Sequence, residues 1–437
     1  MVKVLGFLLF LVFAEDRNCA YAHHMNAPLD WIHPYLLEPT PIKLRPFDLV
    51  MLVVLFGSQA PRRPGLARPM RNALLLVLGT TVFSTLYGLT HGGEFRYSSW
   101  QTYLILSMVL SAFAIAAACR TPAHFIHLAK WLVAAAVYRA LMCWISYFTW
   151  AKGLIGQSGE FITSHADTIT WVVSIMVLLV EMVDRRSVSV RLRNLLLILF
   201  FLGAIQFNSR RLAWVSLTMG LVMFYVLFPQ GVAKRRINRV LVVLSPLILA
   251  YVVVGWGRPE KIFLPLASFS SVSTQEDSST LARNAENLGL IFTGNSASRA
   301  FGTGWGRPYS YLTLKYDISG FELWRYVPHN SILGLLAFTG ILGFAGFWLA
   351  VPTSVYFNAR VARLAADTAA RRVALIGVAQ LIVCCNQLYG DMGIFEPAAM
   401  YVVAVSYAMA LRLPTRTGLW GPAAPPPNQA PAPQPIG

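Results

Sequence analysis

The fold class of this chain is decided by one stretch, residues 195–228, which reads LLLILFFLGAIQFNSRRLAWVSLTMGLVMFYVLF. Its only charged residues are Arg210 and Arg211, and an apolar run extends on either side of them. A helix in lipid satisfies its own backbone hydrogen bonds and needs about 20 mostly apolar residues to span the bilayer. The stretch therefore predicts two membrane helices joined by a short polar turn.

The rest of the chain repeats this pattern. Of its 437 residues, 56% are hydrophobic and 13% are charged, whereas a soluble domain has about 25% charged residues. This composition excludes a soluble cytosolic enzyme, a disordered protein and a disulfide-stapled secreted domain. We predict an all-α, polytopic membrane protein with about twelve transmembrane helices and one large external loop. The apolar segments are residues 2–14, 46–60, 72–90, 100–118, 131–150, 168–183, 194–207, 212–228, 240–256, 331–357, 373–389 and 398–413.

Basic residues predict the orientation, because cytoplasmic loops are enriched in Lys and Arg. One set of connections holds 18 basic residues, and the alternate short connections hold 4. The first set is therefore expected in the cytoplasm. The net charge of +17 follows from these loops and does not indicate nucleic-acid binding. The basic connections are residues 61–71, 119–130, 184–193, 229–239 and 358–372.

These predictions divide the chain into four regions. Residues 1–256 hold about nine membrane helices, 257–330 form the large loop with short helices, and 331–413 hold three more helices. Residues 414–437 form a tail rich in Pro and Ala, which is predicted to be disordered and cytoplasmic. The first apolar segment also has features of a signal peptide, although the polar residues after Ala14 favour an uncleaved helix.

Candidate functional residues gather on the external side. Arg210 and Arg211 lie at the outer end of two helices, against the charge bias, so that they either clamp an anion or extend to lipid headgroups. Arg283 lies on a short amphipathic helix predicted in the large loop. The later run Gly302–Gly306 either approaches a ligand closely or, as we favour from the glycines alone, forms a flexible surface loop.

His329 and Asn330 precede an apolar helix at the outer surface. A neutral imidazole there could accept a proton from a hydroxyl, although a helix-capping or interfacial histidine is the alternative. Asp391, in the last external turn, could orient His329, offset the arginine charge or simply be a solvated turn residue. Arg139 is a charge within an apolar segment, where it could bind substrate or pair with a carboxylate.

These features together resemble the superfamily of O-antigen ligases and O-antigen polymerases of the bacterial envelope. The matching features are the Ser209-Arg210 junction, Arg283, the glycine run and His329-Asn330 before a Leu/Gly-rich helix. The resemblance is most specific over residues 208–346. The family also has a Gly-x-Phe pattern that often ends in Asn, where this chain has His165 after Gly159 and Phe161.

The resemblance implies a multi-pass enzyme of the bacterial inner membrane with its active site facing the periplasm. The donor would be a glycan linked to undecaprenyl diphosphate, and the acceptor a lipid A-core or a growing glycan. Carried over by position, Arg210 and Arg283 hold the diphosphate and His329 is the candidate base, with Arg211, Asn330, Asp391 and Arg139 as further candidates for binding substrate. No cofactor, metal or nucleic acid is implied.

Two other classes of protein remain open from the sequence. One is a multi-helix transporter of a lipid-linked or anionic substrate, although we find no internal repeat and the polar residues gather at the outer face. The other is a metal-dependent glycosyltransferase of lipid-linked sugars that uses Glu15 and Asp16. The residues do not separate a ligase from a polymerase, because the two enzymes share a donor and differ in acceptor.

Overall fold

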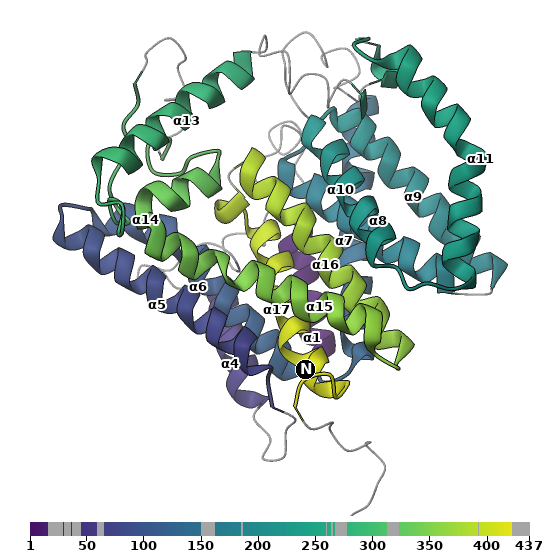
Figure 1. Ribbon diagram of the computed structural model, residues 1–437, viewed down its shortest axis with the longest axis horizontal. Helices are drawn as coiled ribbons and strands as arrows, with labels where there is room; N and C mark the ends of the chain where they lie inside the picture. The colour runs from purple at the N-terminus through teal and green to yellow at the C-terminus, as the bar shows by residue number, and fades with distance from the viewer. Residues whose placement is uncertain are drawn as a thin grey trace, which may run out of the picture.

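The computed structural model is a helical bundle (Figure 1), and every regular element in the part of the chain that it describes is a helix. The central helices α16 (Thr368–Gly390) and α17 (Pro397–Arg416) are surrounded by the others (Figure 1). The structure describes residues 1–15, 29, 36, 45–58, 65–149, 162–184, 187–258, 260–263, 265–266, 278–312, 323–391 and 393–421. Asp16 and most of the predicted tail, residues 422–437, lie outside this part.

The predicted apolar segments all fold as helices. Within the described residues, nine of these spans are long and apolar enough to cross a membrane, which is the architecture of a polytopic membrane protein. The nine are α5 (Arg68–Thr90), α6 (Phe95–Ala118), α7 (Pro122–Thr149), α8 (His165–Asp184), α9 (Val188–Asn208), α11 (Val232–Gly255), α14 (Ser331–Trp348) together with α15 (Ala350–Leu364), α16 and α17.

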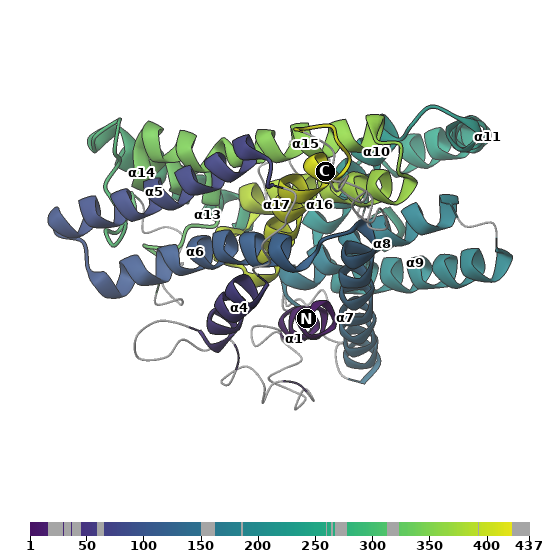
Figure 2. The same cartoon turned by 90° about the horizontal axis from the view of Figure 1, so that it is seen from below.

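Three further apolar helices are shorter than a span, so a total of twelve spans stays a prediction. They are α1 (Val2–Ala14), α4 (Pro46–Gly57) and α10 (Arg211–Leu227). The start of α1 meets the end of α4, where the Ser58 hydroxyl contacts the Met1 sulfur. Both helices lie on one side of the bundle (Figure 2).

Small residues allow α17 to occupy the centre of the bundle. Ala399, Ala404 and Ala408 are fully buried in it, and small side chains let membrane helices approach closely. By contrast, α11 stands at the edge (Figure 1), and its residues 238–250 are all exposed. An apolar helix with an exposed surface of this kind is suited to contact with lipid.

The α9–α10 turn is only two residues long. Asn208 ends α9, Arg211 begins α10, and Ser209 between them adopts a left-handed φ of 55°. We call the end of the bundle that holds this turn the α9–α10 end. The loop after α11 returns there through η3 (Lys261–Phe263) and α13 (Ser278–Ser296), the helix that the sequence predicts around Arg283.

The segment predicted as one helix over 331–357 is broken. Gly340 has a φ of 61° within α14, and the helical path then continues through α15 to Leu364. Loop residues satisfy the backbone at the break: the N–H groups of Thr303 and Gly304 donate to the carbonyls of Ala337 and Phe338. Backbone groups that leave a helix within a membrane need such partners, so the loop and the break stabilise each other.

The glycine run is therefore packed against the helices, which corrects the interpretation of a flexible surface loop. Gly304 has a φ of 81°, and a Cβ on it would lie 2.2 Å from the Cα of Gly88 in α5. Trp305 is 1% exposed and its backbone N–H donates to the Ser84 carbonyl. The run is a packed connection between α5 and the break in α14.

Candidate active site

Arg210 is fixed at the α9–α10 end by two contacts. Its Nη1 lies 2.6 Å from His165 Nε2, and its Nη2 donates to the Thr163 carbonyl at 3.1 Å. The Thr163 N–H in turn donates to the Asn208 side chain at 2.9 Å. These contacts tie the start of α8 to the α9–α10 turn, so that the guanidinium position is set by both.

The turn after α16 joins the same group. Asp391 Oδ2 lies 3.2 Å from His165 Nε2 and accepts a hydrogen bond from Gln387 at 3.2 Å. Arg283 of α13 reaches this turn and donates to the Gly390 carbonyl at 2.5 Å. Three elements that are far apart in the sequence, α8, α13 and α16, therefore meet here.

The pKa of Asp391 reflects both its burial and the neighbouring charges. Burial raises the pKa of Asp391, and the neighbouring Arg283, His329 and Arg210 partly offset this rise because they stabilise the carboxylate. A carboxyl group that keeps its proton more readily weakens the repulsion of an incoming anion. We call Arg210, Arg283, His329, Asp391 and His165 the charged cluster.

His329 is oriented by a buried carboxylate that the sequence did not single out. Its Nδ1 lies 3.1 Å from Glu286 Oε2, and its backbone N–H donates to the same carboxylate at 3.2 Å. The Glu286 side chain is 2% exposed and the His329 side chain 30%. Tyr309 donates its hydroxyl to Glu286 at 3.0 Å. When Nδ1–H is directed at Glu286, Nε2 is the ring nitrogen that can accept a proton.

The arrangement combines a fixed positive charge with an oriented base. Two guanidinium groups can bind phosphate oxygens. A histidine whose Nδ1 is held by a carboxylate is suited to take a proton from a hydroxyl at Nε2. The chemistry that these groups support is attack by a hydroxyl with a phosphate-containing leaving group.

Four predicted site residues, Arg210, Arg283, His329 and Asp391, are thus brought together, and three others are not. Asn330 is the N-cap of α14, and its side chain accepts a hydrogen bond from the Leu333 N–H at 3.1 Å. Arg211 is the exposed first residue of α10. Asn330 therefore caps a helix, and Arg211 follows Arg210 in the chain with an exposed side chain.

Arg139 pairs with a carboxylate, which is the alternative to binding substrate that the sequence analysis left open. It is 1% exposed and makes a bidentate pair with Asp167, with N–O distances of 2.6 and 2.8 Å. Its Nη1 also donates to the Ala14 carbonyl at 3.2 Å. The pair joins α1, α7 and α8 two residues after His165, and so holds the start of α8 in place.

The sequence analysis did not predict two residues of the site, Glu286 and His165, although each has a recognisable feature in the sequence. Glu286 follows Arg283 by three residues, a spacing that places both side chains on one face of a helix. His165 occupies the position where the resembling family often has Asn, and no role was assigned to it. Gly159 and Phe161 of that pattern lie outside the described residues.

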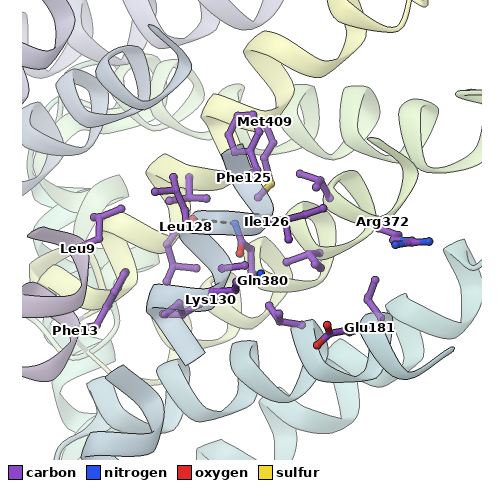
Figure 3. A pocket seen from close by; sticks show the side chains of 18 residues that line it. Leu9, Phe13, Phe125, Ile126, Leu128, Lys130, Glu181, Arg372, Gln380 and Met409 are labelled. Carbon is purple, nitrogen blue, oxygen red and sulfur yellow. Dashed lines mark hydrogen bonds between the residues drawn. The ribbon is translucent and has the colours of Figure 1, made fainter. Parts of the chain in front are cut away.

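The charged cluster coincides neither with a metal-ligand group among the described residues nor with the cavity in the bundle. Among the described residues, no three His, Cys, Asp or Glu side chains are arranged to hold a metal ion. A cavity of about 110 Å³ lies between α1, α7, α8, α16 and α17 (Figure 3). Its lining is mostly apolar, and its charged residues Lys130, Glu181 and Arg372 belong to the opposite end of the bundle.

Comparison with known proteins adds no assignment. No protein-family model matches this chain, and no curated protein matches it. The function proposed below therefore depends on the residues and their geometry.

Proposed function

We propose that this protein is a membrane glycosyltransferase that moves a glycan from undecaprenyl diphosphate to an acceptor hydroxyl, as O-antigen ligases and polymerases do. One observation carries the proposal. Arg210, Arg283, His329 and Asp391 come from four separate segments and gather at one end of the bundle, where buried Glu286 orients the histidine. This end faces the periplasm of the inner membrane if the basic connections are cytoplasmic.

The reaction can be written with these groups. The acceptor oxygen forms a bond to the anomeric carbon of the donor, and its proton passes to His329 Nε2. The bond between that carbon and the diphosphate oxygen breaks, and its electron pair leaves with the diphosphate. Arg210 and Arg283 stabilise the added negative charge, because fixed donors act strongly in a site that excludes water. Glu286 stabilises the imidazolium that forms.

A discontinuous helix is also a feature of transporters, where the broken backbone holds a substrate or ion. The break at Gly340 differs from this arrangement. Its carbonyls at Ala337 and Phe338 accept hydrogen bonds from the glycine run. The N–H groups of Ile341 and Leu342 donate to the carbonyls of Arg299 and Ala300. The backbone groups at the break are therefore hydrogen-bonded to other parts of the protein rather than directed at a substrate or ion. This arrangement favours the enzyme over the transporter.

The proposal is tested by the surface glycans of a strain that lacks this protein. We expect lipid-linked polymer to accumulate without attachment if the enzyme is a ligase, and single repeat units to remain if it is a polymerase. Complementation with the wild-type gene should restore the glycan, whereas His329→Ala and Arg283→Ala should not restore it at matched expression. A normal glycan pattern in the deletion strain would contradict the proposal.

A further inference from the structure

Four partly exposed aromatic rings are gathered beside the Glu286–His329 pair. Tyr97, at the start of α6, stacks on Tyr326 with a centroid distance of 3.9 Å and an interplanar angle of 15°. Trp324 meets Tyr311 edge to face at 5.1 Å and 87°. We call Tyr97, Tyr311, Trp324 and Tyr326 the aromatic platform.

Tyr309 contacts both the aromatic platform and the carboxylate that orients the candidate base. Buried Tyr309, whose hydroxyl donates to Glu286, has Trp324 edge-on at 6.5 Å. The Tyr309 N–H donates to the Arg325 carbonyl at 2.9 Å. Arg325 Nη2 in turn donates to the Tyr309 carbonyl at 3.3 Å. The segment that carries Trp324 and Tyr326 reaches His329 within a few residues. Its hydrogen bonds to Tyr309 therefore fix the position of the rings relative to the histidine.

The platform is also held to the membrane helices. Gln101 of α6 donates to the Tyr326 carbonyl at 2.7 Å and accepts from the Gly306 N–H at 2.6 Å. One glutamine thus joins both loop segments to α6, next to Tyr97. Rings with this much support lose little freedom when a ligand covers them, which favours binding.

The chemistry of the platform fits a sugar ring. One face of a pyranose presents C–H groups, which pack on an aromatic ring, while its hydroxyl groups remain at the rim. Arg325 is exposed, and its guanidinium carbon lies over the Trp324 ring at 5.8 Å from the centroid, so its N–H groups can bond to hydroxyl groups of a sugar beside that ring.

Aromatic residues also occur at membrane surfaces, where Trp and Tyr rings anchor a protein at the headgroup level. Such anchoring requires rings that face the lipid. The four rings of the aromatic platform are instead only partly exposed and contact other aromatic side chains, whereas an anchoring ring is largely exposed to lipid. Trp256, which is 59% exposed at the end of α11, has the expected character of an anchoring residue and provides a control.

We propose that the aromatic platform is a carbohydrate subsite, which binds a pyranose ring of the glycan next to His329. This inference deepens the proposed function, on which it rests, because it assigns residues that recognise the glycan rather than the diphosphate. The glycan can belong to the donor or to the acceptor, since both carry sugar rings.

The inference is tested by binding of purified protein in detergent to an array of bacterial surface oligosaccharides that carry no lipid or diphosphate. The wild-type protein should bind a defined subset of these glycans. Trp324→Ala should bind about tenfold more weakly, whereas Trp324→Phe and the control Trp256→Ala should retain binding. Thermal unfolding of each variant checks that it is folded, and Tyr326→Ala replaces Trp324→Ala if the latter unfolds.

The outcomes separate this inference from the proposed function. If the wild-type protein binds no glycan, if Trp324→Ala and Tyr326→Ala bind as well as wild type, or if Trp256→Ala loses as much, the subsite is wrong. Glycan binding that depends on Trp324 while no transfer is found supports the subsite and contradicts the transferase. Where transfer is found, a higher KM of Trp324→Ala for the donor or for the acceptor identifies which glycan occupies the platform.

Discussion

At the scale of single residues, the site depends on which atoms each charged group uses. Arg210 contacts His165 with one terminal nitrogen and Thr163 with the other. Lysine keeps the charge but has all its N–H donors on a single nitrogen. It therefore cannot make both contacts and bind a phosphate at the same time. The guanidinium shape, and not only its charge, therefore matters at this position.

We expect Arg210→Lys to lose most transfer activity, by about 1.5–3 kcal/mol, the value of a hydrogen bond to a charged group. Arg211→Lys is the matched control, because its side chain is exposed on the next residue and is expected to have a milder effect. The measurement is the transfer rate from a defined lipid-diphosphate donor. A larger loss in Arg211→Lys would show that the wrong arginine has been assigned.

Glu286→Gln is expected to lower kcat about 10- to 100-fold with little change in KM, because it removes the carboxylate that stabilises imidazolium. In the His329→Ala background the same substitution should cause no further loss, since the two residues act as a unit. Glu181→Gln, at the opposite end of the bundle, is the control. Full activity of Glu286→Gln would remove Glu286 from the mechanism.

At the scale of elements, the glycine run between α13 and α14 packs closely against α5 and the break in α14. A Cβ on Gly88 of α5 would lie 2.0 Å from the Trp305 carbonyl oxygen, whereas a Cβ on Gly79 of the same helix has no neighbour within 4 Å. The two glycines differ only in what faces them, so they form a matched pair.

Gly88→Ala should therefore destabilise the protein by about 1–3 kcal/mol, because the backbone of the loop must move. Gly79→Ala is expected to be neutral or slightly stabilising, since alanine is the better helix former. Thermal unfolding of the two purified variants in the same detergent compares them directly. Equal unfolding temperatures would mean that the loop does not pack against α5 as described.

The same elements show what a sequence can and cannot predict here. Apolar runs identify the helices, because a segment that spans lipid as a helix needs a long run of apolar residues. The break at Gly340 was not predicted, since the residues around it are as apolar as those of an unbroken span. What decides the break is the distant glycine run, which supplies its hydrogen bonds.

The charged cluster was predicted in part for a similar reason. Arg210 and His329 are visible as unusual residues at the outer ends of helices, Arg283 as a charge on the helix of the large loop, and Asp391 as a lone charge in its region. The roles of Glu286 and His165 depend on contacts across 43 and 45 residues of chain, and spacing does not reveal such contacts.

At the scale of the whole molecule, the polar chemistry is concentrated at the α9–α10 end, and arginines supply its positive charge. We therefore expect transfer activity to survive exhaustive chelation. The measurement is the transfer rate of purified protein with and without EDTA. Activity that is lost with EDTA and restored by magnesium or manganese would favour the metal-dependent alternative with Glu15 and Asp16.

The central claim is tested most directly by reconstituting the purified protein in lipid with an undecaprenyl-diphosphate-linked glycan and its acceptor. Mass spectrometry then follows both the conjugate and free undecaprenyl diphosphate. The account predicts that the two products appear in equal amounts with wild-type protein and that neither appears with folded His329→Ala. Equal product formation by His329→Ala, or release of undecaprenyl diphosphate without any conjugate, would contradict it.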